Sequence, residues 1–179
     1  MYLGRPERFT EGSVQILVGD ILKSKAQTLI NTVNCVGVMG KGIALEFKNR
    51  FPDMYKDYVQ RCRRGEVKPG VPYLYETVYP LQIINFPTKD HWKSISKMSD
   101  IERGLEHLVE HYQEWGVRSL AIPALGCGNG QLEWRTVGPL IYPYAKEMAI
   151  PVELYAPYGA NPKEIKEEWS LRPSAIWLL

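Results

Sequence analysis

The sequence has few of the residues that mark extracellular, metal-binding or membrane proteins. Its three cysteines, Cys35, Cys62 and Cys127, are far apart and lack the paired spacing of a zinc site or a redox motif. No apolar run approaches the roughly 18 residues of a membrane helix, and no apolar stretch of signal-peptide type stands at the N-terminus. We therefore expect reduced thiols, no metal or cofactor, no membrane partner and a cytoplasmic location.

An excess of charge of one sign is also missing. The chain has 22 Lys and Arg residues against 20 Asp and Glu residues, a net charge of +2, so its composition does not predict a nucleic-acid binder. Basic residues do gather between Lys48 and Lys68. They indicate either a solvated helix face or a weak contact with a nucleic-acid backbone.

A glycine-rich stretch, Asn31–Leu45, is the most distinctive part of the sequence. Gly37, Gly40 and Gly42 follow an apolar run, and their spacing fits neither the Walker loop nor the dinucleotide fingerprint. Glycine lets the backbone approach a ligand closely, and a helix N-terminus offers free N–H groups to an anion. The stretch therefore predicts a phosphate-binding loop, although a plain turn between strand and helix is the alternative.

Hydrophobic periodicity predicts strands and helices that alternate along the chain. Ser99–Glu102 is a predicted capping box, Gly116 a predicted helix end, and 23–28 a predicted helical turn. Alternation predicts an α/β fold, a three-layer α/β/α sandwich around a mixed, largely parallel sheet. We expect one domain over 1–156, with its core at 13–156, and a tail over 157–179 that docks or leads to a further domain. The expected strands are 13–18, 29–33, 73–78, 81–85, 117–122 and 151–156, and the expected helices start near 42 and 55 and span 99–115 and 134–148.

A second glycine loop, Gly126–Gly130, follows another predicted strand. Ligands of parallel sheets bind at the carboxyl ends of the strands, so two such loops can hold a diphosphate between them. Asp20, just after the first strand, can accept hydrogen bonds from a base, or can simply form a turn. His107 and His111 are four residues apart, but no third metal ligand is positioned by the sequence, and we expect surface histidines.

Several of these segments together resemble the macrodomain, a module that binds ADP-ribose. The resemblance covers about residues 13–156, and Asn31–Leu45 with Phe86–Lys89 is most similar to the macrodomains of DarG antitoxins, relatives of the terminal ADP-ribose glycohydrolase branch. The segments that carry it are Gly19-Asp20-Ile21, Asn31-Thr-Val-Asn34, Gly37-Val-Met-Gly40-Lys41-Gly42 and Ile122-Pro-Ala-Leu-Gly126-Cys-Gly128.

The resemblance implies an enzyme that removes ADP-ribose from thymidine in single-stranded DNA and so reverses the action of a DarT-type toxin. Its implied partners are ADP-ribose, ADP-ribosylated single-stranded DNA and a DarT-type toxin. Carried over by position, the implied ADP-ribose ligands are Asp20 and Ile21 at the adenine, Asn34, Gly37, Val38, Met39, Gly40, Lys41 and Gly42 at the distal ribose, Leu125, Gly126, Cys127, Gly128, Asn129 and Gly130 at the diphosphate, and Tyr155 as an adenine platform or, alternatively, a core residue.

Lys89 matches the catalytic lysine of this branch. Cleavage of an N-glycosidic bond leaves negative charge on the departing base, so a nucleophile, an acid or a cation is needed, and a lysine can serve as each. Without the resemblance, Lys89 would be interpreted as an exposed loop lysine. The branch pairs its lysine with an aspartate where this chain has Gly130, and Asp90 and Glu133 do not occupy that position, which puts a joint lysine–aspartate mechanism in doubt.

Lys41, Lys89, His91, Trp92 and Lys93 can offer charge and one stacking surface to a DNA strand outside the cleft, although Trp92 can instead cover the core. Three other functions stay open at this point. They are dephosphorylation of ADP-ribose 1″-phosphate, non-catalytic reading of ADP-ribose, and deacetylation of O-acetyl-ADP-ribose.

Overall fold

The computed structural model describes residues 12–161, and residues 1–11 and 162–179 lie outside the described part. The described chain forms one six-stranded sheet in the order β1-β6-β5-β2-β4-β3. Every neighbouring pair is parallel except β3, which pairs antiparallel with β4 at the edge. The strands are β1 (Val14–Val18), β2 (Thr28–Val33), β3 (Tyr73–Glu76), β4 (Gln82–Pro87), β5 (Leu120–Ile122) and β6 (Val152–Ala156).

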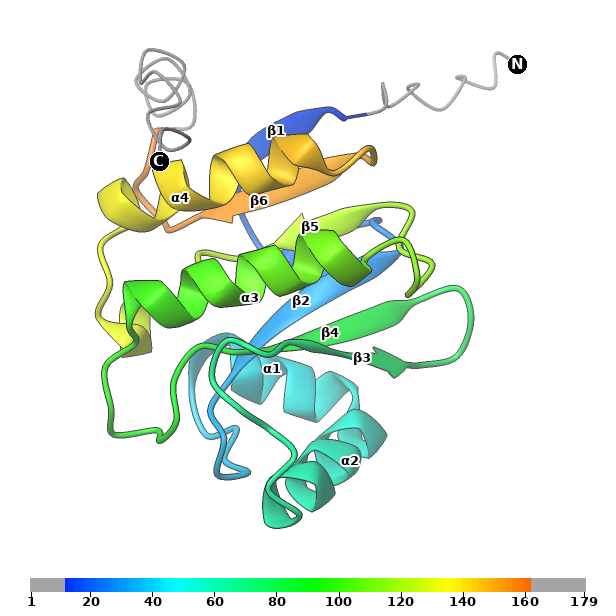
Figure 1. Ribbon diagram of the computed structural model, residues 1–179, viewed down its shortest axis with the longest axis vertical. Helices are drawn as coiled ribbons and strands as arrows, with labels where there is room; N and C mark the ends of the chain where they lie inside the picture. Colours follow the sequence, from blue (N-terminus) through cyan, green and yellow to red (C-terminus); the bar gives the residue numbers. More distant parts are fainter. Residues whose placement is uncertain (1–11, 162–179) are drawn as a thin grey trace.

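Helices cover both faces of this sheet (Figure 1). Helices α3 (Met98–His111) and α4 (Trp134–Glu147) lie on one face, and α1 (Gly42–Arg50) and α2 (Pro52–Arg63) pack against the other. The predicted three-layer α/β/α fold with a mixed, largely parallel sheet is therefore confirmed. Most of the tail predicted for 157–179 lies outside the described residues, so its docking stays a prediction.

The core is divided into two apolar layers by the central strands. Leu29 and Ile83 point to the layer under α1 and α2, whereas their neighbours Ile30 and Ile84 point to the layer under α3 and α4. Strands buried on both faces read as continuous apolar runs, as β2 and β4 do. Helix α3 can approach β4 closely because Gly104 has no side chain. A Cβ atom there would lie 2.2 Å from the Phe86 ring.

Three local predictions were wrong. Helix α3 begins at Met98 with Lys97 as its N-cap and no side-chain cap, so Ser99 lies inside the helix and the capping box is not formed. The helix ends at His111, and Gly116, with a φ of 67°, closes the turn that follows. The helical turn expected at 23–28 lies instead at η1 (Ile21–Lys23), because the Asp20 carboxylate accepts a hydrogen bond from the Leu22 N–H at 3.0 Å.

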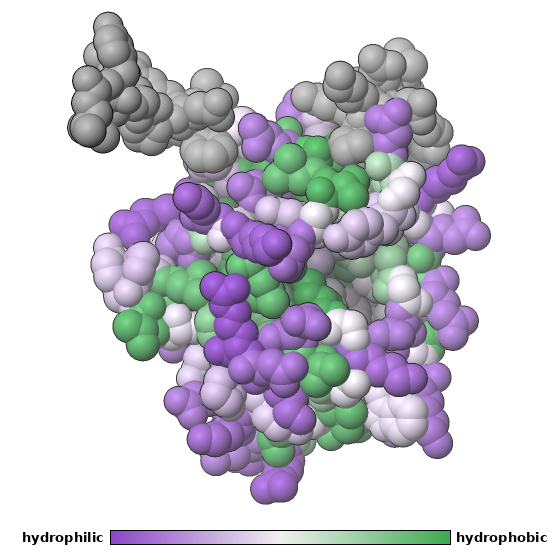
Figure 2. Space-filling model, turned by 180° about the vertical axis from the view of Figure 1, so that it is seen from behind, coloured by the Kyte–Doolittle hydropathy of each residue, from purple (hydrophilic) through white to green (hydrophobic). Residues whose placement is uncertain are grey.

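Two basic residues of α2 pair with acidic residues of the same helix. Lys56 Nζ lies 3.0 Å from an Asp53 oxygen, and Arg61 Nε lies 2.7 Å from an Asp57 oxygen. Figure 2, seen from the side opposite to α3 and α4, shows hydrophilic side chains interspersed with small hydrophobic patches over this part of the molecule. These pairs neutralise part of the local positive charge and favour the interpretation of a solvated helix face over a nucleic-acid contact.

The parallel strands bring the predicted site segments to one edge of the sheet. β1, β2, β4, β5 and β6 run in the same direction, so Asp20, Asn34, Lys89 and Gly126 all follow strands at their carboxyl ends. β2 lies between β5 and β4, so its carboxyl end lies between the ends of the strands that lead to the second glycine loop and to Lys89. Within residues 12–161, no helix is long and apolar enough to cross a membrane.

Candidate functional site

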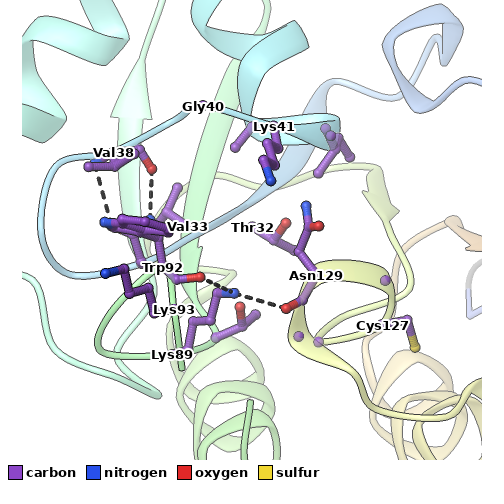
Figure 3. A pocket seen from close by; sticks show the side chains of 18 residues that line it. Thr32, Val33, Val38, Gly40, Lys41, Lys89, Trp92, Lys93, Cys127 and Asn129 are labelled. Carbon is purple, nitrogen blue, oxygen red and sulfur yellow. Dashed lines mark hydrogen bonds between the residues drawn. The ribbon is translucent and has the colours of Figure 1, made fainter. Parts of the chain in front are cut away.

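A cavity of about 630 Å³ lies between the two glycine loops at this edge (Figure 3). Its walls come from the segments after β2, β4 and β5 and from the first turn of α1. Most of the predicted site residues line it: Asn34, Val38, Gly40, Lys41, Gly42, Lys89, Gly126, Cys127, Gly128, Asn129 and Gly130.

The first glycine loop is shaped by the Asn34 side chain. Asn34 Oδ1 accepts hydrogen bonds from the N–H groups of Val36 and Val38 at 3.1 and 3.4 Å, and its Nδ2 donates to the Val38 carbonyl at 2.7 Å. The buried Tyr58 hydroxyl lies 2.9 Å from the Asn34 carbonyl oxygen and 2.8 Å from Oδ1. Asparagine often closes turns in this way. Asn34 thus holds the loop in a fixed shape at the cavity wall.

Helix α1 presents its N-terminus to the cavity. Lys41 is the N-cap and makes no side-chain capping bond, so the first N–H groups of the helix are left without a side-chain acceptor. Gly42, Ile43 and Ala44, the residues of this first turn, line the cavity. The positive end of the helix dipole and these N–H groups together favour an anionic ligand.

The second glycine loop is shaped by close packing. A Cβ atom at Gly126, which has a φ of +72°, would lie 2.6 Å from Leu132 Cδ1. A Cβ atom at Gly130 would lie 2.4 Å from Ser96 Oγ, and the Ser96 N–H donates a hydrogen bond to the Gly130 carbonyl at 2.9 Å. Ser96 therefore fills the space in which an aspartate side chain would stand at position 130.

Lys89 is buried at the base of the cavity, with only 9% of its surface exposed, so its interpretation as an exposed loop lysine was wrong. Its Nζ donates to the Trp92 carbonyl at 3.1 Å and to the Asn129 carbonyl at 3.0 Å (Figure 3). Burial lowers the pKa of this amine from its ordinary value. The two carbonyl oxygens accept hydrogen bonds from it and thereby fix its position between the loops after β4 and β5.

Positive charge prevails in the cavity. Among the described residues that line it, the charged side chains are Lys41, Lys89 and Lys93, and no Asp or Glu takes part. Such a lining suits an anion and lacks the carboxylate pair that most glycosidases use. The half-buried Cys127 thiol is no obvious nucleophile either, because burial raises its pKa to about 11.

Six of the predicted site residues do not line the cavity. The side chains of Ile21, Met39 and Leu125 are buried in the core, which leaves only their backbones for a ligand. Asp20 caps η1, and the Tyr155 hydroxyl donates to Glu153 at 2.9 Å. The roles of these residues stay predictions, as does that of Gly37.

Five residues of the cavity wall were not predicted from the sequence. All lie within two residues of predicted ones: they stand at the end of β2, directly after β4 or in the first turn of α1. The signal that could have found them is the rule that ligands lie at the carboxyl ends of parallel strands. They are Thr32, Val33, Ile43, Ala44 and Thr88.

The two histidines of α3 stack on each other instead of converging on a metal position. The ring centroids of His107 and His111 are 4.0 Å apart, and His111 Nδ1 lies 2.8 Å from the His107 carbonyl oxygen. Within residues 12–161, no group of three or more His, Cys, Asp or Glu residues is arranged to hold a metal ion.

Comparisons with known proteins agree with this geometry. The family model of the Macro domain matches residues 30–141. A fusion protein of Thermosipho africanus, named DNA ADP-ribosyl transferase-DNA ADP-ribosyl glycohydrolase, is 42% identical over 163 residues, which make up 81% of this chain and 42% of that protein. The chain thus spans less than half the length of this curated relative.

Two solved structures are similar in both fold and sequence. The macrodomain of Mycobacterium tuberculosis DarG has a TM-score of 0.79 and 41% identity, over 82% of this chain and 99% of that one. Thermosipho africanus DarTG in complex with ADP-ribose has a TM-score of 0.80 and 40% identity, over 90% of this chain and 46% of that one. With more than half of its residues matched by the family model and this likeness to a whole DarG macrodomain, the chain belongs to the macro domain family and, within it, to the DarG type.

Proposed function

We propose that this chain binds ADP-ribose in the cavity and hydrolyses the bond between ADP-ribose and a thymidine base of single-stranded DNA. The observation that carries the proposal is the buried amine of Lys89, held by two carbonyl oxygens between the loops that follow β4 and β5. A relative named DNA ADP-ribosyl glycohydrolase and a similar structure with ADP-ribose bound support the same substrate class. We also propose a cytoplasmic location, where such DNA occurs.

The charge of the cavity supports ADP-ribose as the ligand. A diphosphate is an anion, and the first turn of α1 offers uncapped N–H groups at one wall while the backbone of Gly126–Gly130 forms the other. Lys41 adds a positive charge beside the helix N-terminus. In this arrangement the diphosphate spans the gap between the loops, and the distal ribose lies near Asn34 and Lys89.

Lys89 acts as the acid or cation at the departing base. Water adds to the anomeric carbon of the ribose and loses one proton to solvent, the bond to the base nitrogen breaks, and the base leaves with the bonding electrons and needs a proton or a positive partner. Hydrogen bonds to the carbonyls of Trp92 and Asn129 favour the charged amine, while burial lowers its pKa and makes it a stronger acid. A lysine has three N–H donors, so one remains for the substrate.

A DarT-type toxin is the natural source of the modified DNA. The Thermosipho africanus relative carries in its name both the transferase and the glycohydrolase. We propose that this chain reverses the reaction of such a transferase. The curated relative extends well beyond the matched residues. Direct contact with the toxin is therefore not assigned to the matched part of the chain and is a separate proposal.

The test is turnover of a thymidine-ADP-ribosylated single-stranded oligonucleotide by wild type, Lys89→Ala and the matched control Lys56→Ala. Lys56 is an exposed lysine of α2, paired with Asp53 and outside the cavity wall. We expect wild type and Lys56→Ala to release ADP-ribose at similar rates, and Lys89→Ala to be at least about 100-fold slower. Calorimetric titration with ADP-ribose would establish that Lys89→Ala still folds.

Other outcomes would redirect the assignment. If wild type binds ADP-ribose but releases none from the modified DNA, the proposed hydrolase activity is refuted. Release of phosphate from ADP-ribose 1″-phosphate that survives Lys89→Ala would then favour a phosphatase, and the absence of any turnover would favour a reader of ADP-ribose. Release of acetate from O-acetyl-ADP-ribose would indicate a deacetylase.

A further inference from the structure

Trp92 stands at the mouth of the cavity and is unusually exposed for its size. Its side chain lines the cavity, yet 48% of its surface is open to solvent. The alternative that Trp92 covers the core is therefore wrong. A large ring left in water beside a ligand cavity offers a planar apolar face to whatever projects from that cavity.

We propose that Trp92 is the platform on which the ADP-ribosylated base of a single DNA strand stacks, and that Lys93 and Lys41 attract the phosphates on either side of it. This inference rests on the proposed function. Every base has a flat π-face, and proteins that hold single strands combine aromatic platforms with positive charge along the backbone. The bases of a duplex are already stacked on one another, so the platform favours single strands.

The platform is joined to the reacting group through its own backbone. The Trp92 carbonyl accepts a hydrogen bond from Lys89 Nζ at 3.1 Å, and Figure 3 shows Trp92, Lys93 and Lys89 on the same side of the cavity. A base stacked on Trp92 therefore lies beside the amine that would protonate it. Trp92 would be a specificity-determining residue for the base, while the ADP-ribose moiety is held by the loops.

A base that stacks on Trp92 must displace a neighbour from its ring. The His91 ring lies 5.4 Å from the Trp92 ring at an angle of 28°, and Lys93 Nζ lies 5.0 Å from the ring centroid. Lys93 is exposed, and an exposed cation on an aromatic ring is held more weakly than a stacked base. The Lys93 ammonium can thus move to a phosphate when the base arrives, and the His91 ring stays in place.

The rim is fixed before any ligand binds. The Asp90 carbonyl accepts a hydrogen bond from the Cys35 N–H at 3.0 Å, the Asp90 carboxylate accepts one from the His91 N–H at 2.8 Å, and His91 Nδ1 accepts one from the Lys93 N–H at 3.1 Å. A rigid platform loses little conformational freedom on binding, so more of the stacking energy appears as affinity.

The experiment compares the ADP-ribosylated oligonucleotide with free ADP-ribose. Variants are Trp92→Ala, Trp92→Phe, Lys93→Ala and the control Tyr79→Ala, which removes an even more exposed ring from the remote loop between β3 and β4. We expect Trp92→Ala to lower kcat/KM on the oligonucleotide about tenfold or more, and Trp92→Phe to retain most of it. Affinity for ADP-ribose should stay within about twofold, and the effect of Lys93→Ala should fade at high salt.

Failure of this inference is distinguishable from failure of the proposed function. Binding of the oligonucleotide is measured in Lys89→Ala with and without Trp92→Ala, which needs no turnover. The platform is refuted if the two variants bind the oligonucleotide alike. It is also refuted if Trp92→Ala weakens the binding of free ADP-ribose as much as the binding of the oligonucleotide. If wild type does not release ADP-ribose but Trp92→Ala still weakens the binding of the oligonucleotide, the proposed hydrolysis fails and the platform stands.

Discussion

The two glycine loops that enclose the cavity are built by different means. The loop after β2 takes its shape from hydrogen bonds of Asn34 and Tyr58, and its tip is exposed from Gly40 to Gly42. The loop after β5 takes its shape from contacts that leave no space for side chains, with Gly126 and Gly130 both buried. Glycine therefore has a different structural role in each of the two loops.

This difference separates two causes for glycine. In the loop after β5, Gly126 and Gly130 are required by their neighbours, Leu132 and Ser96. In the loop after β2, a Cβ atom at Gly40 would meet only Val38 Cγ1, at 3.6 Å, so the packing of the fold does not require a glycine there. A side chain at Gly126 should thus destabilise the fold, whereas one at Gly40 should mainly weaken ligand binding.

The largest effect is expected for Gly126→Ala. The added Cβ would combine a strained φ of +72° with a 2.6 Å contact to Leu132, and should lower the free energy of unfolding by about 3 kcal/mol. Gly128→Ala is the matched control, since its φ is +66° but nothing lies within 4 Å, and it should cost about 1 kcal/mol. Chemical denaturation of both variants measures the difference, and equal losses would contradict the packing argument.

A smaller effect is expected for Tyr58→Phe, on the other side. The change removes a buried hydroxyl that contacts both oxygens of Asn34, and should cost about 1–2 kcal/mol of stability and weaken ADP-ribose binding. Tyr55→Phe is its control, because that hydroxyl is 3.4 Å from the Gly37 carbonyl and only half-buried. Chemical denaturation and calorimetry measure both variants, and a larger loss of stability or affinity in Tyr55→Phe than in Tyr58→Phe would contradict this prediction.

The pH dependence of turnover should distinguish the loops again. Burial lowers the pKa of Lys89, so a rate that needs its ammonium should fall on the alkaline side at a pH below 10.5. Gly130→Ala should displace the Asn129 carbonyl, which stabilises the charged amine, and move this limb to still lower pH. Tyr58→Phe should leave the limb where it is, and a shift of equal size in both variants would argue against the separation.

The smallest effect on stability is expected for Gly40→Ala. Its φ is not in the left-handed region and its surroundings are open, so the free energy of unfolding should change by less than about 0.5 kcal/mol. Any loss should appear in the affinity for ADP-ribose, measured by calorimetry on the folded variant. A fall in melting temperature comparable with that of Gly126→Ala would break the comparison between the loops.

Much of the fold and half of the site could be read from local pattern. Alternating apolar periodicity predicted the layers, because β2 and β4 are buried on both faces, and the glycine motifs predicted both loops. The start of α3 could not be predicted in this way, since Lys97 takes the cap position although Ser99 is the better capping residue. Tertiary packing there overrides the local preference.

The burial of Lys89 was beyond local pattern for a different reason. Its surroundings are made by Trp92, three residues away, and by Asn129, which is distant in the sequence and arrives through the pairing of β2 with both β4 and β5. Only the resemblance drew attention to this lysine. Thr32 and Thr88 were missed likewise, because their residue type does not distinguish them and only their place at the carboxyl ends of β2 and β4 brings them to the cavity.

The contact between Ser96 and Gly130 also constrains how this site can change over evolutionary time. The first side-chain carbon of an aspartate at position 130 would lie 2.4 Å from the Ser96 hydroxyl, so the Ser96 side chain would have to move to admit it. A smaller residue at position 96 would remove this contact. The effect of a substitution at position 130 therefore depends on the residue at position 96, and the two positions are expected to change together.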